Sequence, residues 1–360
     1  MALRRAILVV LLGALSALAI RPDSGEARGM SSMLYKRKRD KQTDKERTNM
    51  RPIIGVVSQE GDPAPKGHTY IAASYIKFLE AAGARVIPIL ADMPPEEVER
   101  RFKLVNGILV PGGSQVLRPG HGFYDVTSKI FELTLKANDH GDFFPLHGTC
   151  LGFETLAVIA SKNHSILSEF DAENLPSPLF PTDKAEKSEF FSVLPHKVYE
   201  NLLTKPYAME NHVNGLAWTA IAENPTLVDF FDVLTLSIDR GGRTYVSTME
   251  AIDYPITATQ WHPEKNAYEW TLDKDIPHNP EAIVITQEVG NFFVNRARRN
   301  QHNIANHDDE VDLLIYNFDL VYTGKAKFEG EEVDFDESYF FPPWEKVREV
   351  EEAKRQARSG

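Results

Sequence analysis

The sequence contains one cysteine, Cys150, among its 360 residues. A single cysteine cannot form a disulfide within the chain, so its thiol is free or pairs with another molecule. After residue 20 the sequence lacks any apolar run of the roughly 20 residues that span a bilayer. It also lacks a basic excess, because 40 Lys and Arg stand against 52 Asp and Glu and the net charge is −12. We therefore expect no nucleic-acid partner, and no membrane association of the mature chain.

The first 20 residues are typical of a secretory signal peptide. Two arginines precede the apolar run Ala6–Ile20, and Ala17-Leu18-Ala19 fits a small-x-small cleavage site. The alternative is a membrane anchor, for which the run is short. We predict a cleaved signal peptide at 1–20 and a basic polar leader, disordered, at 21–50. The protein is then expected to enter the secretory pathway.

Strand and helix patterns alternate over the next part of the chain. Apolar, β-branched runs predict strands, and the amphipathic segments between them predict helices. The strands are Arg51–Ser58, Arg85–Leu90 and Asn106–Val110, and the helices run from about Ser74 to Gly83 and from Pro94 to Phe102. This alternation predicts an α/β fold: a three-layer sandwich with a mostly parallel central sheet, of the flavodoxin-like kind. We place the catalytic domain at 51–325 and a charged C-terminal extension at 326–360.

The second half of the chain has a less regular pattern. Pro176, Pro178 and Pro181 are expected to break the chain between 165 and 235. Two consecutive strands are predicted at Thr244–Met249 and Pro255–Gln260. Further predictions are helices at 120–138, Glu281–Arg299 and Glu345–Arg358, and a short strand-like run at Leu314–Tyr316.

The pattern around the cysteine is that of a nucleophile. A short apolar strand ends near Leu146, a helix follows Cys150, and Gly148-x-Cys150-x-Gly152 lies between them. This is the strand-to-helix nucleophile elbow, with cysteine in the place of serine. The glycines are expected to allow close backbone approach, and the helix N-terminus to lower the thiol pKa and favour the thiolate. The simpler alternative is a cysteine buried as a small apolar residue.

A glycine pair follows the third predicted strand, in Pro111-Gly112-Gly113-Ser114. Open α/β sheets bind ligands at the carboxyl ends of their parallel strands. We therefore expect the backbone N–H groups of Gly113 and Leu151 to form an oxyanion hole. The alternative is a plain turn.

His262 is the candidate base, because it directly follows a predicted strand and stands two residues before Glu264. A thiol that attacks an amide needs a base, and the base needs an orienting carboxylate. If Pro263 links them in an extended conformation, His262 and Glu264 point the same way. The alternative is that His262, one of 11 histidines, lies on a surface loop.

Taken together, these motifs resemble the γ-glutamyl hydrolases, within the class I glutamine amidotransferase superfamily. The stretches that carry the resemblance are Tyr70–Tyr75, Gly107–Ser114, Gly148–Glu154, Ser247–Glu250, Gln260–Lys265 and Tyr268–Trp270. It extends from about Arg51 to Asn303, and more faintly to Gly324. The resemblance implies a glutamine amidotransferase-like fold.

The same resemblance implies an activity and a set of site residues. The activity is cleavage of γ-linked glutamates from folylpoly-γ-glutamates and antifolate polyglutamates, through a γ-glutamyl thioester, with no cofactor or metal. Cys150 is then the nucleophile, His262 the proton carrier and Glu264 their support. The implied substrate-binding residues are His212, Gly112, Ser114 and Glu154. Members of the family act in lysosomes, in vacuoles or outside cells, and are often homodimers.

Some questions stay open at this point. His147 stands where the family often has an aromatic residue such as Trp, and packing is its simpler role. Arg118 and Lys265 each pair with a substrate carboxylate or remain solvated. Asn163 begins the sequon Asn-His-Ser, a potential glycosylation site. Two other functions are a glutaminase acting on free glutamine and an inactive homologue that only binds.

Overall fold

The structure is a computed structural model that describes residues 48–325, 327–328, 331–332 and 335–359. The signal peptide predicted at 1–20 lies outside these residues, as does the leader predicted at 21–50 up to residue 47. Within the described residues, no helix has the length and apolar character needed to cross a membrane.

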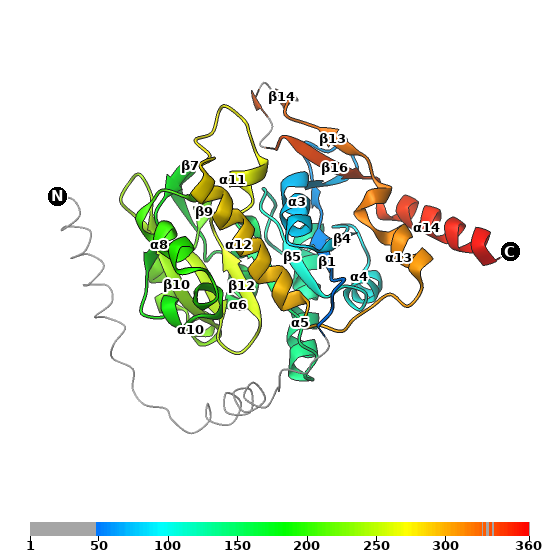
Figure 1. Cartoon of the computed structure of the whole chain (residues 1–360), viewed down its shortest axis with the longest axis horizontal. Coiled ribbons are helices and arrows are strands. Elements are labelled where there is room, and N and C mark those ends of the chain that lie inside the picture. Colours follow the sequence, from blue (N-terminus) through cyan, green and yellow to red (C-terminus); the bar gives the residue numbers. More distant parts are fainter. Residues whose placement is uncertain (1–47, 326, 329–330, 333–334, 360) are drawn as a thin grey trace. The chain divides into compact units, whose positions relative to one another are not determined.

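An eight-stranded sheet lies at the centre of the fold, in the order β4-β1-β5-β6-β12-β11-β10-β8 (Figure 1). Its first five strands are parallel: β4 (Arg85–Ile89), β1 (Ile53–Val57), β5 (Gly107–Val110), β6 (Leu146–Thr149) and β12 (Ile256–Thr259). Helices cover both faces of these strands, which is why the sequence shows continuous apolar runs there. Numbered among themselves, the five strands have the 2-1-3-4-5 order of flavodoxin-like sheets. The predicted α/β fold is confirmed.

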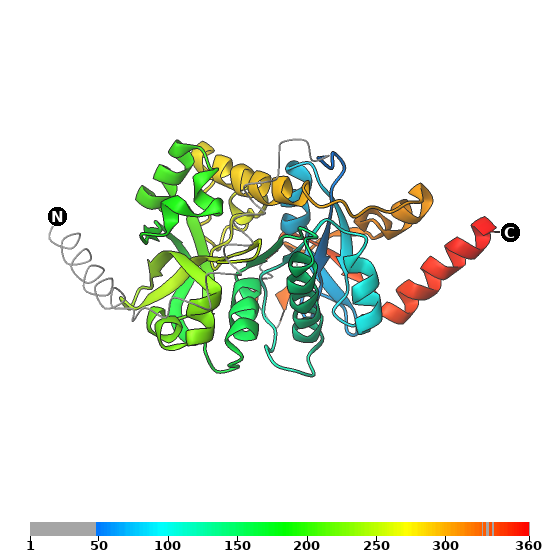
Figure 2. The same cartoon turned by 90° about the horizontal axis from the view of Figure 1, so that it is seen from below.

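Helices form the two outer layers (Figure 2). On one face α3 (Ala73–Ala81) packs against α12 (Pro280–Ala297). On the other face α5 (Gly122–Asp139) packs between α4 (Pro95–Phe102) and α6 (Leu151–Ser161). The predicted helices at these places are confirmed to within a few residues.

Three antiparallel strands extend the parallel sheet beyond β12. They are β11 (Thr244–Ala251), β10 (Phe231–Ile238) and β8 (Phe180–Pro181). The two consecutive strands predicted from the sequence correspond to β11 and β12, so that prediction is confirmed. The connections contain short helices: η1 (Ala185–Lys187), α7 (Glu189–Ser192), α8 (His196–Thr204), α9 (Trp218–Glu223), α10 (Pro225–Phe230) and α11 (Lys265–Tyr268).

The expectation that Pro176 breaks the chain is wrong. Pro176 lies inside the ten-residue strand β7 (Ser168–Ser177), where it is paired with Met209 of β9 (Ala208–Gly215). In the part of the chain that the structure describes, β7 has β9 as its one neighbour. A proline is tolerated on such an edge strand because its missing N–H can face the open side.

The C-terminal part of the chain returns to the beginning of the domain. Strand β16 (Glu337–Phe341) pairs with β3 (Thr69–Ala72), in a second sheet of order β13-β16-β3-β2. The other strands are β2 (Gln59–Glu60), β13 (Leu320–Tyr322) and a pair formed by β14 (Lys327–Phe328) and β15 (Glu331–Glu332). The strand predicted at 314–316 is wrong, since Ile315–Asn317 forms the 3-10 helix η2. The domain boundary at 325 stays a prediction.

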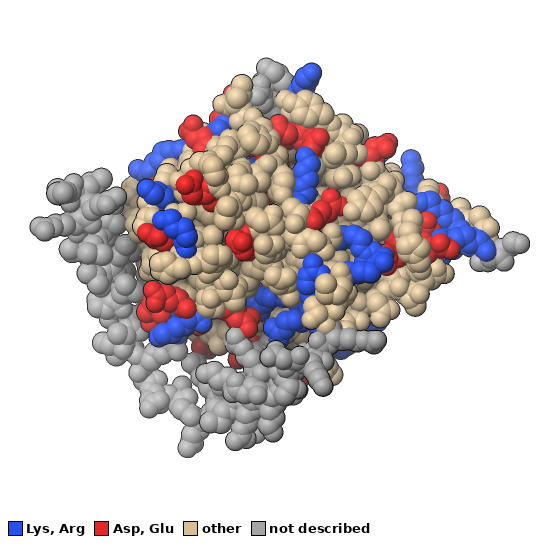
Figure 3. Space-filling view, viewed as in Figure 1, with Lys and Arg blue, Asp and Glu red and all other residues tan. Residues whose placement is uncertain are grey.

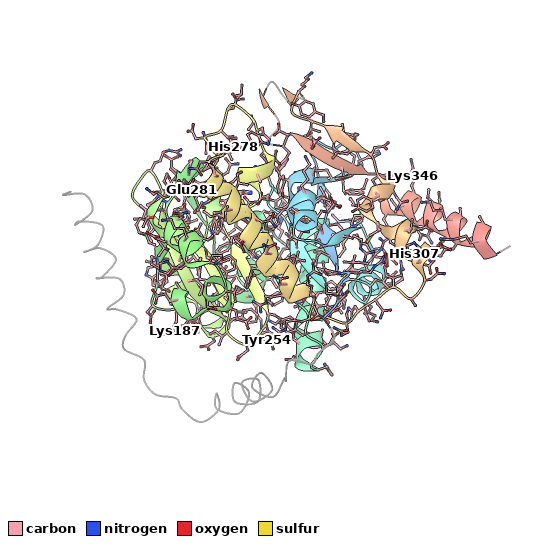
Figure 4. All side chains as sticks on the ribbon, viewed as in Figure 1. Lys187, Tyr254, His278, Glu281, His307 and Lys346 are labelled. Carbon is pink, nitrogen blue, oxygen red and sulfur yellow. The ribbon has the colours of Figure 1, made fainter. Side chains whose placement is uncertain are left out.

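The predicted charged helix at the C-terminus is confirmed as α14 (Trp344–Ser359), which packs beside α13 (His307–Leu313). Figure 4 labels His307 and Lys346 in these two helices. On the face drawn in Figure 3, acidic and basic side chains are interspersed.

Helix α14 is attached to α4 by a buried ion pair. Arg101 of α4 is 1% exposed, and its guanidinium donates to Glu97 at 2.9 Å and to Glu351 of α14 at 2.5 Å. The ring of Trp344 lies 5.5 Å from the same guanidinium. A buried guanidinium is tolerated because acceptors surround it.

Replacing Glu351 with leucine is expected to lower the free energy of unfolding by about 3 kcal/mol, because one buried partner of Arg101 is lost. The measurement is urea-induced unfolding of the purified protein. Glu352→Leu is the matched control, since Glu352 is exposed and its ion pair is worth about 0.5 kcal/mol. Equal loss in both variants would contradict the prediction.

Candidate active site

Three neighbouring parallel strands end at the candidate site. Gly148 of β6 is paired with Val110 of β5 on one side and with Ala258 of β12 on the other. The chain that follows these strands carries Gly112 and Gly113, Cys150, and His262. Because the carboxyl ends of parallel strands meet at one edge, residues far apart in sequence come together there.

Cys150 occupies a strained turn between β6 and α6. Its backbone has φ +51° and ψ −107°, a conformation that residues with a side chain rarely adopt. A β-carbon on Gly152 would lie 2.1 Å from the carbonyl oxygen of Val110, and one on Gly148 would lie 2.7 Å from Gly152. The predicted need for glycine on both sides of the nucleophile is therefore confirmed in steric terms.

Burial dominates the electrostatics of Cys150, whose side chain is 4% exposed. Desolvation raises the pKa of the thiol well above its ordinary value, and the carboxylates of Glu154 and Glu264 raise it further. Lys265 and the N–H of Leu151 act in the opposite direction and are outweighed. We expected the helix N-terminus to lower the thiol pKa. The N–H of Leu151 does act in that direction, but the net shift is upward, so the expected low thiol pKa is wrong. This direction favours the protonated thiol, and Sγ donates to the carbonyl oxygen of Asn211 at 3.9 Å.

His262 and Glu264 form a buried pair at the end of β12. Nδ1 of His262 lies 2.6 Å from Oε1 of Glu264, and the backbone N–H of His262 donates to Met209 in β9. Burial lowers the pKa of His262, and the Glu264 carboxylate offsets this only in part. Burial by itself would raise the pKa of Glu264, but His262 brings it below its ordinary value. A neutral imidazole next to a carboxylate is the result.

The arrangement of this pair matches the prediction, although the connecting backbone does not. Pro263 and Glu264 lie in a turn that leads into α11, rather than in an extended link. Nε2 of His262 is buried and has no hydrogen-bond partner among the described residues. This nitrogen is therefore the one available to take up a proton. In an unliganded site such contacts are commonly still open.

Tyr75 is a buried residue of the site that sequence reasoning did not single out. Its hydroxyl lies 3.4 Å from Nδ1 of His262 and accepts the N–H of Gly112 at 2.8 Å. A β-carbon on Gly112 would lie 2.6 Å from this hydroxyl, 2.8 Å from Cε1 of His262 and 3.0 Å from Cβ of Cys150. Only glycine fits where these three side chains converge. The conspicuous Tyr70–Tyr75 motif was the available signal.

The predicted site residues are brought together around one pocket of about 960 Å³. The predicted residues that line it are Cys150, Leu151, Glu154, His212, His262, Gly113 and Ser114. Gly112 and Glu264 do not line the pocket, but both are next to His262, which does. Arg118 and Lys265 also line the pocket, whereas Asn163 is exposed next to the lining residue His164.

Two polar residues of the lining are held by hydrogen bonds to neighbouring residues. The ring of His212 has Nδ1 2.7 Å from the Asn214 carbonyl and Nε2 3.2 Å from the Glu210 carboxylate. Burial raises the pKa of Glu154 to about 7, although His212 and a hydrogen bond from Gln260 act to lower it. Both residues therefore have fixed side chains within the pocket.

The C-terminal segment contributes Phe335 to the pocket lining, a residue that sequence reasoning missed. Its ring lies 4.9 Å from Nζ of the buried Lys265. The next residue, Asp336, donates its backbone N–H to Glu269 at 2.8 Å. Burial raises the pKa of Glu269 to about 7, and Lys265 lowers it.

His147 lies behind the site and has a packing role, in agreement with the simpler interpretation of the sequence. It is 1% exposed, its Nδ1 lies 2.9 Å from the hydroxyl of Thr257, and burial lowers its pKa to about 4. Across the described residues, the structure has no group of three or more His, Cys, Asp or Glu placed to hold a metal ion.

The sequence is similar to that of a known family of proteins. A sequence model described as peptidase C26 matches residues 52–264, a range that includes Cys150, His262 and Glu264. Gamma-glutamyl hydrolase 1 of Arabidopsis thaliana is 40% identical over 300 residues, which are 81% of this chain and 83% of that protein. The gamma-glutamyl hydrolase of Mus musculus is 40% identical (81% and 90% covered), and that of Homo sapiens 39% identical (82% and 91%). The solved structure of a putative GMP synthase component from Thermoplasma acidophilum covers 68% of this chain and 94% of its own at a TM-score of 0.37 and 17% identity.

The steric requirement at the elbow predicts the effect of adding one methyl group. Gly152→Ala is expected to lower the free energy of unfolding by at least about 3 kcal/mol, because the backbone of β5 must move away from the new β-carbon. Thermal unfolding measures the effect. Gly241→Ala is the control, since its β-carbon would lie no closer than 3.3 Å to the nearest atom. Near-equal melting temperatures would contradict the prediction.

Proposed function

The chain belongs to the peptidase C26 family, and from this premise we propose that it cleaves γ-linked glutamates from folylpoly-γ-glutamates and antifolate polyglutamates. One observation carries the proposal: a buried thiol, Cys150, lies in the same pocket as the free Nε2 of a histidine that Glu264 orients. Similar proteins of the same family are named gamma-glutamyl hydrolases.

The pocket lining offers cationic groups to an anionic substrate, although the carboxyl groups of Asp62, Glu154 and Glu173 also line it. A poly-γ-glutamate carries one α-carboxylate on each residue, and each needs a cation or an N–H donor when it leaves water. Arg118 and Lys265 line the pocket together with His164 and His212. We propose that Arg118 and Lys265 bind substrate carboxylates, with Ser114, Glu154 and His212 placing the rest of the chain.

The proposed first half of the reaction forms a thioester. As Sγ of Cys150 attacks the γ-carbonyl carbon, Nε2 of His262 takes the thiol proton. The carbonyl oxygen becomes an oxyanion held by the N–H groups of Gly113 and Leu151. Collapse of this intermediate breaks the C–N bond, and His262 returns its proton to the leaving amine. A γ-glutamyl thioester on Cys150 remains.

Water completes the proposed reaction. His262 removes a proton from the water as it attacks the thioester carbonyl, and the same two N–H groups hold the second oxyanion. The C–S bond then breaks, the sulfur regains its proton from His262, and the product leaves with a free γ-carboxylate. Both halves start from a neutral imidazole, which the lowered pKa of His262 provides.

The predictions on domains, location and assembly also remain proposals. We propose a signal peptide at 1–20, a leader at 21–50, a catalytic domain at 51–325 with a C-terminal extension at 326–360, entry into the secretory pathway and a homodimer. N-terminal sequencing of protein recovered from the medium or from lysosomes or vacuoles tests the cleavage. Analytical ultracentrifugation tests the dimer.

The first experiment is hydrolysis of a folate pentaglutamate by the wild type and by Cys150→Ala. The wild type is expected to release glutamate or short polyglutamates, and the variant to be reduced by at least about 10³-fold, because no nucleophile remains. Free glutamine serves as the comparison substrate. Ammonia release from glutamine without cleavage of the polyglutamate would favour a glutaminase. Equal cleavage by both proteins would rule out Cys150 as the nucleophile, and no cleavage by either would favour a homologue that only binds.

The His262–Glu264 pair predicts a specific pH dependence. Since protonated His262 cannot act as base, kcat/KM should fall as the pH drops through the lowered pKa of His262, below about 6.5. The Glu264 carboxylate raises that pKa, so Glu264→Gln should shift the acid limb to lower pH while kcat falls by about 10²- to 10⁴-fold. Rate profiles against pH measure both effects. An unshifted limb would contradict the assignment, and the exposed Glu223→Gln is the control.

A further inference from the structure

Gln59 carries a buried side-chain amide next to the loop of Gly112 and Gly113, which is called the oxyanion loop below. No sequence motif identified this residue. We propose that Gln59 is a positioning residue: its side chain fixes the peptide between Gly112 and Gly113 so that the N–H of Gly113 faces the reacting carbonyl. This inference rests on the function proposed above.

The backbone of Gln59 is held by the second sheet. Gln59 is 1% exposed and belongs to β2, where it is paired with Tyr70 of β3. Strand β3 is in turn paired with the C-terminal strand β16. The side chain therefore extends from a fixed sheet toward the loop that follows β5.

One hydrogen bond joins Gln59 to the loop. Nε2 of Gln59 donates to the carbonyl oxygen of Gly112 at 2.5 Å. That carbonyl and the N–H of Gly113 belong to the same planar trans peptide and point in opposite directions. Fixing the carbonyl on the Gln59 side therefore fixes the N–H on the other side. The N–H of Gly112 is already used, because it donates to the hydroxyl of Tyr75.

The side-chain amide also fills the space next to Gly113. A β-carbon at position 113 would lie 1.7 Å from Oε1 of Gln59, and Gly113 has φ +155°. Among the described residues, Oε1 accepts no hydrogen bond, so it does not take the N–H of Gly113. Exchanging the two amide atoms would place Oε1 against the Gly112 carbonyl, which is repulsive. The orientation with Nε2 toward Gly112 is therefore the one that gives the Gly112 carbonyl a hydrogen-bond donor.

The chemical consequence concerns the transition state. The oxyanion forms only during attack and collapse, so a displaced Gly113 N–H weakens the transition state more than substrate binding. Losing an oxyanion donor outright lowers kcat by about 10²- to 10³-fold. A variant that leaves the donor present but unfixed should lose less, about 10- to 10²-fold, with KM changed by less than about threefold.

Gln59→Met tests this effect, because it keeps the length and shape of the side chain and removes the donor. Gln59→Asn is the second variant, since its amide is one methylene too short to reach Gly112. Both should lower kcat on the folate pentaglutamate by the stated factor. Gln287→Met is the matched control, since Gln287 lies on α12 and donates to Asn291 and to the Ala81 carbonyl. It should leave kcat unchanged.

Two reactions of Cys150 separate positioning of the oxyanion hole from general damage. An N-acylated glutamate γ-semialdehyde adds to Sγ: the C–S bond forms, the thiol proton passes to Nε2 of His262, the aldehyde oxygen becomes an oxyanion and nothing leaves. That oxygen occupies the oxyanion hole. Iodoacetamide alkylates the same sulfur by displacing iodide, and no oxyanion forms. The Gln59 variants should bind the aldehyde about 10- to 10²-fold more weakly and react with iodoacetamide at the wild-type rate.

The inference fails if the Gln59 variants keep wild-type kcat and aldehyde affinity, or if alkylation slows in parallel with both. A wild type that cleaves no γ-glutamyl substrate would instead reject the proposed function. The aldehyde and alkylation comparison still decides the role of Gln59 in that case, because neither reaction needs turnover.

Discussion

Desolvation is the constraint on which the chemistry of this site depends. Cys150, His262 and Glu154 are all buried, and burial shifts the pKa of each in the direction that favours its neutral form. Glu264 is the exception, because the adjacent His262 outweighs the effect of its burial. These directions favour a neutral thiol and a neutral imidazole beside the Glu264 carboxylate. In the proposed reaction the thiol proton therefore passes to His262 as the sulfur attacks, because burial disfavours a thiolate.

The second sheet links two segments far apart in the sequence to the candidate active site. Strand β2 places Gln59 against the oxyanion loop, while the helix that follows β3 places Tyr75 between Gly112 and His262. On the same sheet β16 pairs with β3, and the residues just before it bring Phe335 into the pocket. The parallel strands lead to the proposed reacting groups, Cys150 and His262, and the second sheet contributes residues that contact the loops around them.

The sequence predicted the parts of the site that depend on local pattern and a general rule of topology. Glycines around Cys150 indicated the elbow, and a histidine directly after a strand indicated the base, because parallel strands end at one edge. Gln59 and Phe335 could not be found this way, since their contacts join residues far apart in sequence. The direction of the Cys150 pKa was predicted wrongly for a related reason. A helix N-terminus can be read from the sequence, whereas the depth of burial that outweighs it cannot.

The net charge of −12 for the whole chain says little about the charge of the pocket. That count treats every carboxyl as ionised, yet burial raises the pKa of both Glu154 and Glu269 to about 7. Each of these groups therefore takes up a proton at a higher pH than a solvated glutamate does. As the pH falls into mild acid, both carboxyl groups become neutral. Of the two, Glu154 lines the pocket, so its protonation removes one of the three carboxylates, with Asp62 and Glu173, that an anionic substrate would meet there.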